Sequence, residues 1–337
     1  AESQSIIGAA AQSLVGAAGQ TTTRFEGVPS LVMPDGPAGL RIAPRVGIDD
    51  DGAFALDSAL PADFAELMDD EDEKMLGAMM GTPDRPRTPE RTIEQYATAI
   101  PIGTAVAQSW NPALAEALGD LVGAEMDRFG AHLWLAPAFN LHRSILCGRN
   151  FEYFSEDPLL AGHMAAGITR GVQKHPGRGV TVQHFAFNNQ ETNRLNSCSH
   201  VSKRAARDLY LRSFEIAVRQ AQPHAIMTSY NLLNGVHTSE SAELLEDILR
   251  REWGFEGLVM TDWVVDGMAR TDLRHPRATA AATVRAGNEL FMPGCEADRQ
   301  DILAALAGEN ARTGLTRSEL EKQAARVVRM ARTLAGR

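Results

Sequence analysis

The feature that most constrains the fold is a series of short apolar runs that recur along the chain, with helical patterns between most of them. The runs are Leu31–Met33, Ala99–Ile102, Leu133–Ala136, Val180–Val182, Ala225–Met227, Leu258–Met260 and Leu290–Met292. Runs of this length predict buried strands. Their alternation with helices favours a TIM-like (β/α)8 barrel, with an open doubly wound sheet as the competing arrangement. Seven strands are recognisable, whereas a complete barrel has eight, so one strand is degenerate or missing.

Helical periodicity is clearest in the last third of the chain. Leu244, Leu245, Ile248 and Leu249 share one helical face, and the apolar positions between residues 320 and 334 share another. Thr316 and Glu319 have the spacing of a capping box, which predicts that the last helix begins there. We therefore expect residues 1–337 to form one barrel domain.

Charge and composition exclude several classes of function. The 337 residues carry a net charge of −10 and scattered basic residues, so no nucleic-acid partner is expected. No apolar stretch reaches the roughly 18 residues that a membrane span needs. The first residues show no signal peptide, and a signal removed earlier would leave no trace, so a cytoplasmic or a secreted location stays open. Cys147, Cys198 and Cys295 are far apart, which suits reduced thiols and gives no metal-ligand spacing. No cofactor or metal is expected.

An acidic segment interrupts the pattern and predicts an insertion at about residues 45–90. It contains Asp49–Asp51 and Asp69–Glu73, and periodicity is weak from Asp49 to Lys74. Such blocks of charge usually form solvated loops, although a lid over the mouth of the barrel is an alternative. Pro83–Pro89 predicts a stiff connection back into the barrel.

Polar side chains cluster where the predicted strands end. Asp262 and Trp263 follow Leu258–Met260, and similar positions are held by Asp35, Arg149, Gln183, His184 and Tyr230. The carboxyl ends of barrel strands converge on one face, so these side chains can line one pocket. Without phosphate-loop glycines or metal spacing, such a pocket suits an uncharged polyhydroxyl ligand, which suggests a sugar. The simpler explanation for Asp262 alone is a helix N-cap.

At these residues the chain resembles glycoside hydrolase family 3, specifically the barrel domain of its β-glucosidase-like members. The resemblance spans roughly residues 15–335 and rests on MPDGPAGLR (33–41), GRNFEYFSEDP (148–158), HFAFNNQETNR (184–194), SYN (229–231) and GLVMTDW (257–263). It implies a retaining exo-β-glycosidase, with a β-glucosidase as the expected member and a β-xylosidase or α-L-arabinosidase left open.

The resemblance also implies roles for individual residues. Asp262 would be the nucleophile that forms a covalent glycosyl-enzyme, and Arg149, His184 and Tyr230 would favour its ionised form. Asp35, Arg149, His184 and Arg194 would bind sugar hydroxyls, and Trp263 would form an apolar wall. Simpler explanations remain open: Arg149 could pair with Glu152 or Asp157, His184 could be a core histidine, and Trp263 could be packing.

Two departures from the family pattern matter. Relatives usually carry lysine where this chain has Gln183, and an amide lacks the charge of an ammonium group. The general acid/base of multi-domain relatives is a glutamate on a second α/β domain, which is absent from this chain, so a missing domain or a partner subunit would have to supply it. Neither His200 nor Glu191 is a convincing acid, and Glu191 is expected to pair with Arg194. A sugar-binding subunit with impaired catalysis is therefore a second hypothesis. An aldolase-like barrel lacks support, because Lys74, Lys174, Lys203 and Lys322 lie at no predicted strand end.

Overall fold

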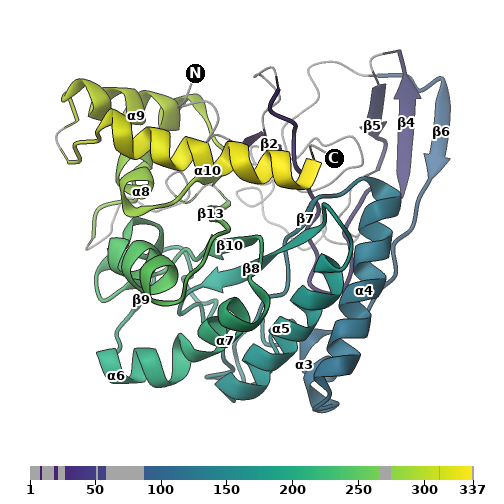
Figure 1. Cartoon of the computed structure of the whole chain (residues 1–337), viewed down its shortest axis with the longest axis horizontal. Helices are drawn as coiled ribbons and strands as arrows, with labels where there is room; N and C mark the ends of the chain where they lie inside the picture. Colours follow the sequence, from purple (N-terminus) through teal and green to yellow (C-terminus); the bar gives the residue numbers. More distant parts are fainter. Residues whose placement is uncertain are drawn as a thin grey trace.

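The centre of the molecule is a curved parallel sheet. The computed structural model describes residues 8–9, 19–21, 27–50, 52–57, 87–263, 265, 275–310 and 312–335. Five strands of the sheet lie in the order β14 (Leu290–Met292), β13 (Leu258–Trp263), β10 (Ala225–Thr228), β8 (Gly179–Phe185) and β7 (Leu133–Trp134). All four pairings are parallel. Figure 1 labels β13, β10, β8 and β7 at the centre of the molecule.

The sheet continues past β7 to β3 (Val32–Met33), the first of the predicted strands. Asp35 bridges to Leu135 in parallel, and the His132 N–H donates to the Val32 carbonyl oxygen at 2.8 Å. On its other side β3 pairs antiparallel with β2 (Gly19–Thr21), which pairs with β1 (Gly8–Ala9). The prediction of a TIM-like barrel is confirmed in the form of a partial barrel.

The side chains of the sheet separate into an inner and an outer set. Leu258 and Met260 of β13 pack in one cluster with Met33, Leu135, Met227 and Met292. Val259 lies in a second cluster, with Val182 and Ile226, against the helices. This alternation follows from the two-residue period of a strand. Asp262 therefore shares the inward side of β13 with Leu258 and Met260, while Thr261 faces outward.

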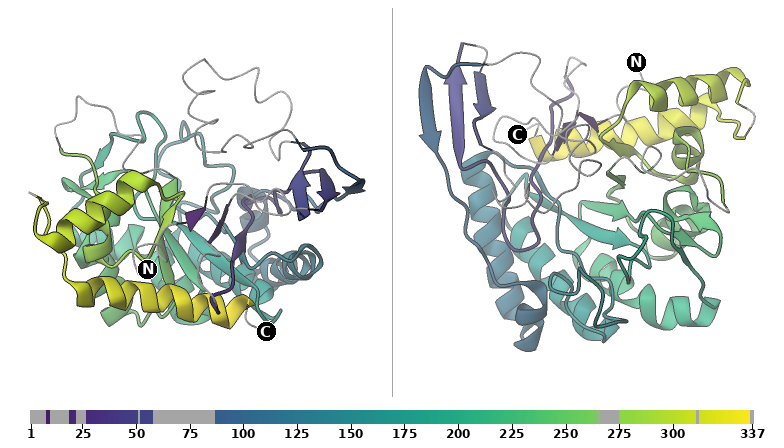
Figure 2. Two further views of the ribbon diagram at one scale, coloured as in Figure 1. Left: turned by 90° about the horizontal axis from the view of Figure 1, so that it is seen from above. Right: turned by 180° about the vertical axis from the view of Figure 1, so that it is seen from behind.

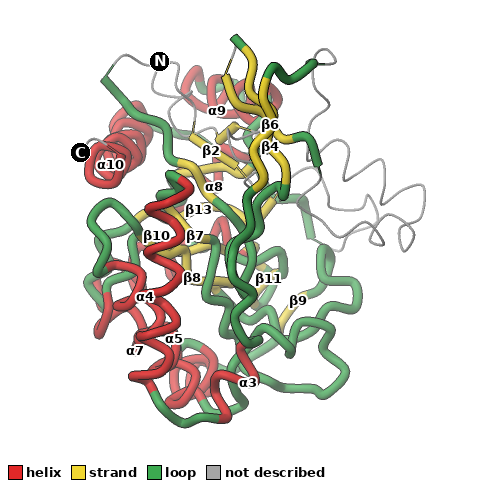
Figure 3. The backbone as a smooth tube through the Cα atoms, turned by 90° about the vertical axis from the view of Figure 1, so that its right-hand side faces the viewer, coloured by secondary structure: helices red, strands yellow, loops and turns green. Residues whose placement is uncertain are grey.

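Helices cover the sheet in two groups (Figure 3). One group packs on the outer cluster and comprises α3 (Gly103–Gln108), α4 (Pro112–Phe129), α5 (Pro158–Gln173), α7 (Arg212–Ala221) and the π-helix η4 (Glu243–Glu252). The other comprises α8 (Ala280–Ala286), α9 (Glu296–Ala307) and α10 (Arg317–Ala335). The capping box before α10 is confirmed: the Glu319 N–H donates to Thr316 Oγ1, and the Thr316 N–H donates to Glu319 Oε2.

Helices α4 and α5 approach each other at backbone distance. A Cβ atom added to Gly171 would lie 2.1 Å from the carbonyl oxygen of Glu116, so only glycine fits there. Asn111 caps α4 and Asp157 caps α5 through side-chain oxygens that accept backbone N–H groups. Asp157 therefore serves α5 rather than pairing with Arg149.

One predicted strand is wrong. Residues 99–102 run extended into α3 and belong to no sheet. Pro101 has no N–H to donate to a ladder, which disfavours a central strand. The apolar character of the run has another cause: Ile100 is buried, and its N–H donates to the Ala38 carbonyl oxygen at 2.9 Å.

Part of the predicted acidic insertion forms a small antiparallel sheet. Its strands lie in the order β5 (Gly52–Ala55), β4 (Arg45–Asp49) and β6 (Arg91–Glu94). Figure 2 shows this sheet at the edge of the molecule opposite α9. The acidic run Asp69–Glu73, Lys74 and Pro83 lie outside the described residues, so the choice between loop and lid stays a prediction.

Short elements complete the chain. They are β9 (Cys198–Ser199), β11 (Leu232–Leu233) and β12 (Val236–His237), which form one sheet, and the helical turns α6 (Lys203–Ala205), η2 (Ala206–Tyr210) and η3 (Thr238–Glu240). Among the helices that the structure describes, none has the length and apolar character to cross a membrane.

Candidate active site

Asp262 lies at the carboxyl end of β13, on its inward side, and is 7% exposed. Its Oδ1 accepts the Trp263 N–H at 2.8 Å, whereas Oδ2 is buried and has no hydrogen-bond partner among the residues described. Burial raises the pKa of the Asp262 carboxyl, and the nearby cations Arg194 and Arg149 oppose that rise. The site thus holds a carboxylate with one oxygen fixed by a backbone N–H and the other buried without a hydrogen bond from the described residues.

Glu152, Arg149 and His184 form a line that ends beside Asp262. Arg149 Nε makes an ion pair with Glu152 Oε1, and Arg149 Nη1 lies 2.8 Å from His184 Nε2. Burial and the Arg149 charge hold the pKa of His184 well below its usual range, so the ring is neutral. Arginine can only donate, so Nε2 must accept and Nδ1 carries the proton.

The contact between His184 and Asp262 is therefore not an ion pair. His184 Nε2 lies 3.7 Å from Asp262 Oδ2, but that nitrogen bears no proton when it accepts from Arg149. His184 Nδ1 is buried and has no acceptor in the described part of the chain. A buried donor and a buried acceptor thus remain without partners at the ends of β8 and β13. Unmade bonds of this kind cost about 1–3 kcal/mol each and are typical of functional sites.

The backbone of His184 is clamped by Asn140. The His184 N–H donates to Asn140 Oδ1, and Asn140 Nδ2 donates to the His184 carbonyl oxygen, both at 2.9 Å. The preceding residue, Gln183, is 2% exposed, and its Nε2 donates to the Leu135 carbonyl oxygen at 3.0 Å. The Gln183 amide therefore links β8 to the residue that follows β7.

A second arginine approaches Asp262 from the loop after β8. The guanidinium carbon of Arg194 lies 4.6 Å from the centre of the Tyr230 ring, and Arg194 Nη1 donates to Glu191 Oε2 at 3.0 Å. The predicted Glu191–Arg194 pair is confirmed. The Tyr230 hydroxyl donates to the Trp263 carbonyl oxygen at 2.8 Å. Burial and the Asp262 charge raise the pKa of Tyr230 well above its ordinary value, so it stays protonated.

Asp35 and Trp263 lie at the margin of this cluster. Asp35 accepts from Arg41 Nη1 at 3.0 Å, and a third of its side chain is exposed. Its negative charge acts on the buried Glu152 carboxyl. Trp263 is half-buried and packs against the cluster that joins β13 and β14 to α8, α9 and α10.

The structure thus groups most of the predicted site residues. Arg149, His184, Arg194, Tyr230 and Trp263 surround Asp262 by contact or charge, Asp35 stands near Glu152, and Gln183 faces the barrel backbone. The predicted Arg149–Glu152 pair is also present, and Arg149 makes it while contacting His184.

Sequence reasoning missed the roles of two residues. Asn140 clamps His184, and its only signal was its place just after the strand at Leu133–Ala136. Asn188 links two parts of the site, because its Nδ2 lies 3.0 Å from the Tyr153 hydroxyl and 2.9 Å from Glu191 Oε1. Asn188 lies inside the motif at residues 184–194, but nothing in the sequence indicates its contacts.

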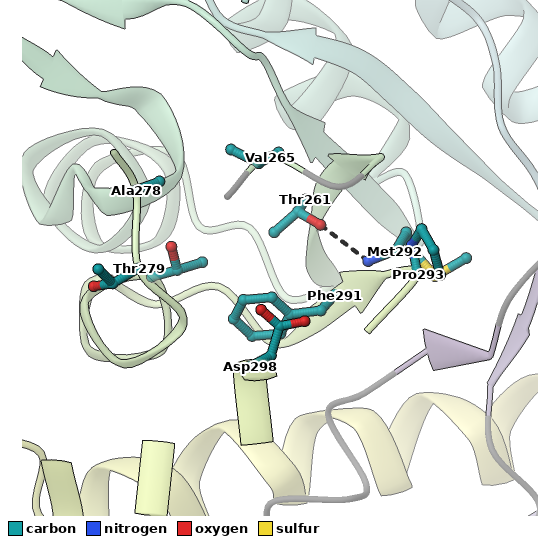
Figure 4. Close-up of a pocket in the computed structure, with 9 residues that line it drawn as sticks. Thr261, Val265, Ala278, Thr279, Phe291, Met292, Pro293 and Asp298 are labelled. Carbon is teal, nitrogen blue, oxygen red and sulfur yellow. Dashed lines mark hydrogen bonds between the residues drawn. The ribbon is translucent and has the colours of Figure 1, made fainter. Parts of the chain in front are cut away.

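A pocket lies on the opposite, outward side of β13 (Figure 4). Thr261, Phe291 and Asp298 line it, and Thr261 Oγ1 accepts the Met292 N–H at 3.0 Å. It has room for roughly one water molecule, which is far too little for a monosaccharide. No group of side chains suited to holding a metal ion occurs among the residues that are described.

Comparisons with known proteins agree with this arrangement. The model of the glycosyl hydrolase family 3 N terminal domain matches residues 89–330. Beta-glucosidase A of Butyrivibrio fibrisolvens is 38% identical over 297 residues, which cover 88% of this chain and 28% of that protein. An exo-alpha-(1->6)-L-arabinopyranosidase of Bifidobacterium longum is 38% identical over 285 residues, which cover 84% of this chain and 31% of that protein.

Solved structures give the same result. Beta-glucosidase 3B from Thermotoga neapolitana in complex with glucose superposes with a TM-score of 0.75 at 34% identity. The match covers 98% of this chain and 41% of that one. This chain therefore spans less than half the length of these relatives.

Proposed function

This chain belongs to glycosyl hydrolase family 3, and from that premise we propose that it is the nucleophile-bearing barrel domain of a retaining exo-β-glycosidase. The observation that carries the proposal is Asp262: a buried carboxylate at a barrel strand end, with one oxygen free of hydrogen bonds to the described residues and two arginines close by. A β-D-glucoside is the proposed substrate, because relatives of 38% and 34% identity are named β-glucosidases.

In the first step Asp262 Oδ2 bonds to the anomeric carbon as the glycosidic C–O bond breaks. The bonding electrons leave with the aglycone oxygen, which takes a proton from a general acid. In the second step water attacks the anomeric carbon, gives its proton to the same group, and releases the Asp262 carboxylate. The Trp263 N–H on Oδ1 orients the carboxylate throughout.

Sugar hydroxyls would be bound by the polar groups around Asp262. Arg149, Arg194 and the His184 Nδ1–H would donate hydrogen bonds, and the Asp35 carboxylate would accept hydrogen bonds from two hydroxyls. Trp263 would give the sugar ring an apolar wall. Gln183 would contribute from the position where relatives usually carry lysine, although its amide donates to Leu135.

The general acid/base is proposed to come from a second domain or a partner subunit. Three other carboxylates of the site are already ion-paired: Asp35 with Arg41, Glu152 with Arg149, and Glu191 with Arg194. His200 is exposed. Burial raises the pKa of Glu152 and the Arg149 charge opposes that rise, but the Glu152 carboxylate is 4% exposed and its Oε1 is engaged by Arg149.

Covalent labelling tests the nucleophile. The protein is incubated with 2-deoxy-2-fluoro-β-D-glucosyl fluoride, whose leaving group needs little acid assistance, and its intact mass is measured. We expect a gain of one fluoroglucosyl unit that maps to Asp262 and is absent from Asp262→Asn. An unlabelled but folded wild-type protein would contradict the proposal and favour a sugar-binding subunit, for which glucose binding without labelling is the expected result.

Azide tests the proposal that the general acid/base comes from a second domain or a partner subunit. When no acid/base assists deglycosylation, azide can attack the glycosyl-enzyme without deprotonation, so it should accelerate turnover of dinitrophenyl β-glucoside and yield β-glucosyl azide. Alkyl glucosides should be hydrolysed far more slowly. Equal rates on alkyl and dinitrophenyl glucosides, with no azide effect, would place the acid within this chain.

A second glycone has specific support. One relative of 38% identity is named as acting on α-(1→6)-linked L-arabinopyranose. Nitrophenyl α-L-arabinopyranoside and β-D-glucoside should therefore be compared by kcat/KM. A higher value for the arabinoside would move the proposed substrate to that sugar without changing the role of Asp262.

A further inference from the structure

We propose that Glu152 is a positioning residue that, through Arg149, holds His184 in the tautomer protonated on Nδ1 and thereby keeps Asp262 Oδ2 free. The tautomer rests on contacts within this chain alone. Its consequence for Asp262 rests on the proposed function above.

The site contains two arginine–glutamate pairs of the same spacing, and they differ in what the arginine reaches. Arg149 pairs with Glu152 and extends to His184. Arg194 pairs with Glu191 and lies over the Tyr230 ring. The side chain of Glu152 is 4% exposed and that of Glu191 is 19% exposed. Only the first pair combines a nearly buried carboxylate with contact to the histidine.

The position of Glu152 is fixed by the start of α3. A Cβ atom on Gly103 would lie 2.1 Å from the Glu152 carbonyl oxygen, so α3 approaches this segment as closely as a backbone can. Thr104 Oγ1 lies 2.7 Å from the Asn150 carbonyl oxygen and 3.0 Å from that of Tyr153. The backbone on both sides of Glu152 is therefore held, and its carboxylate can serve as a fixed anchor for Arg149.

The anchor matters because nothing else described in the structure selects the His184 tautomer. Asn140 holds the backbone of His184 through two hydrogen bonds that do not involve its ring. Nδ1 has no partner in the described chain, and Nε2 has two neighbours, Arg149 Nη1 at 2.8 Å and Asp262 Oδ2 at 3.7 Å. Arg149 can only donate, so its contact requires Nε2 to be unprotonated. Asp262 Oδ2 can only accept, so it would favour a proton on Nε2. The position of the guanidinium decides between them.

Loss of the Glu152 carboxylate would change the tautomer of His184. Without the Glu152 charge, Arg149 is no longer tied to its place, and a proton on Nε2 could bond to Asp262 Oδ2. The nucleophilic oxygen would then be occupied. The other ionisable groups around this contact are Arg194 and Tyr230 beside Asp262, and Asp35, Glu191 and Tyr153 beside Glu152 or Arg149.

The test is the nitrogen NMR signature of His184, assigned with His184→Gln. In the wild type we expect one neutral tautomer, protonated on Nδ1. In Glu152→Gln the Nε2-protonated form should appear. Glu191→Gln is the matched control, because it breaks the other arginine pair, and it should leave the His184 signals unchanged. Wild-type signals in folded Glu152→Gln would overturn the proposal, and so would an equal change in Glu191→Gln.

Arg149→Gln is the second variant if Glu152→Gln does not fold. It removes the charged donor directly and should also populate the Nε2-protonated form; an unchanged tautomer would again overturn the proposal. Labelling by the fluoroglucosyl fluoride then tests the consequence, with a loss of at least about tenfold in rate expected for Glu152→Gln. A wild-type rate would refute the effect on Asp262. Failure to label the wild type would refute the proposed function and leave the tautomer result standing.

Discussion

Asp262 combines two properties that oppose each other: its carboxyl is buried, and the proposed attack on the anomeric carbon requires it to be ionised. Its surroundings pull the pKa in both directions, because desolvation raises it while Arg194 and Arg149 lower it. The net rise in the pKa of Asp262 means that ionisation of this carboxyl lowers the free energy of unfolding at neutral pH. Such trade-offs between stability and activity are common at active sites.

We expect Asp262→Asn to reduce turnover of dinitrophenyl β-glucoside to below about 0.1% of the wild-type kcat/KM, a loss of about 4 kcal/mol or more in transition-state stabilisation. The amide cannot form the covalent intermediate. Asp208→Asn, on an exposed helical segment, is the control and should retain activity. Activity within about tenfold of wild type would refute the role of Asp262.

The same substitution should stabilise the protein. The folded-state pKa of Asp262 lies above its ordinary value, so the wild type loses stability as pH rises above that ordinary value towards 7. The amide of Asp262→Asn cannot ionise, so the variant should have the higher Tm at pH 7. The two Tm values should converge as pH falls toward about 4, the ordinary pKa of an aspartate. A lower Tm for Asp262→Asn at pH 7 would show that the arginines outweigh desolvation.

Among the elements, the strands were the most predictable part. Continuous apolar runs identified β3, β7, β8, β10, β13 and β14, because strands buried on both faces must be apolar throughout. The same rule fails at residues 99–102, where an apolar extended segment forms no hydrogen-bonded pairing with another strand. It also missed β4, β5 and β6, whose mixed sequences lack such a run. The Asn140 clamp was unpredictable because it depends on two segments that meet only in three dimensions.

His132 ties β7 to β3, and this tie is expected to weaken in acid. Its Nδ1 accepts the Val32 N–H at 3.0 Å, and burial lowers the pKa of His132 to about 4. The unfolded chain therefore binds a proton below about pH 6.5 and the folded chain does not. Stability that is complete at pH 7 is lost between about pH 6.5 and 4, by about 1–2 kcal/mol after allowance for partial exposure.

His132→Asn separates this effect from other titrations, because the amide oxygen can accept the same N–H without binding a proton. The Tm of wild type should fall more between pH 7 and pH 5 than that of the variant. Equal falls would show that His132 does not titrate in this interval.

For the molecule as a whole, one buried charge network joins the last helix to the sheet. Glu289 is fully buried just before β14, and its carboxylate accepts from Arg250 of η4, Arg326 of α10 and the Val259 N–H. These contacts lie at the amino-terminal ends of the strands, away from Asp262. A barrel can keep its fold while its chemistry changes when stability and catalysis occupy opposite ends.

Glu289→Ala should destabilise the protein by about 3–5 kcal/mol, because it removes the fully buried carboxylate that the Arg250 and Arg326 guanidinium groups share. Tm is the measurement. Glu243→Gln, which removes an exposed ion pair with Lys203, is the control and should not change Tm measurably. A small effect of Glu289→Ala would mean that Glu246 can satisfy both arginines alone.

At this scale the sequence predicted the barrel and the convergence of distant residues on one end of it, because both follow from strand periodicity and the geometry of parallel sheets. The orientation of Gln183 toward Leu135 and the direction of the Arg149–His184 bond could not be read from it. Both depend on which of several donors and acceptors meet, and neighbours along the chain do not determine that.

The contact of Gly171 with the Glu116 carbonyl has a practical meaning for protein engineering. Replacing a glycine inside a helix by alanine is a standard way to raise heat resistance, with a gain of about 0.5–1 kcal/mol. In α5 that substitution would instead lower it, since a methyl group at Gly171 would meet a carbonyl oxygen at 2.1 Å and force the two helices apart. A library designed from helix propensity alone should leave this position unmutated.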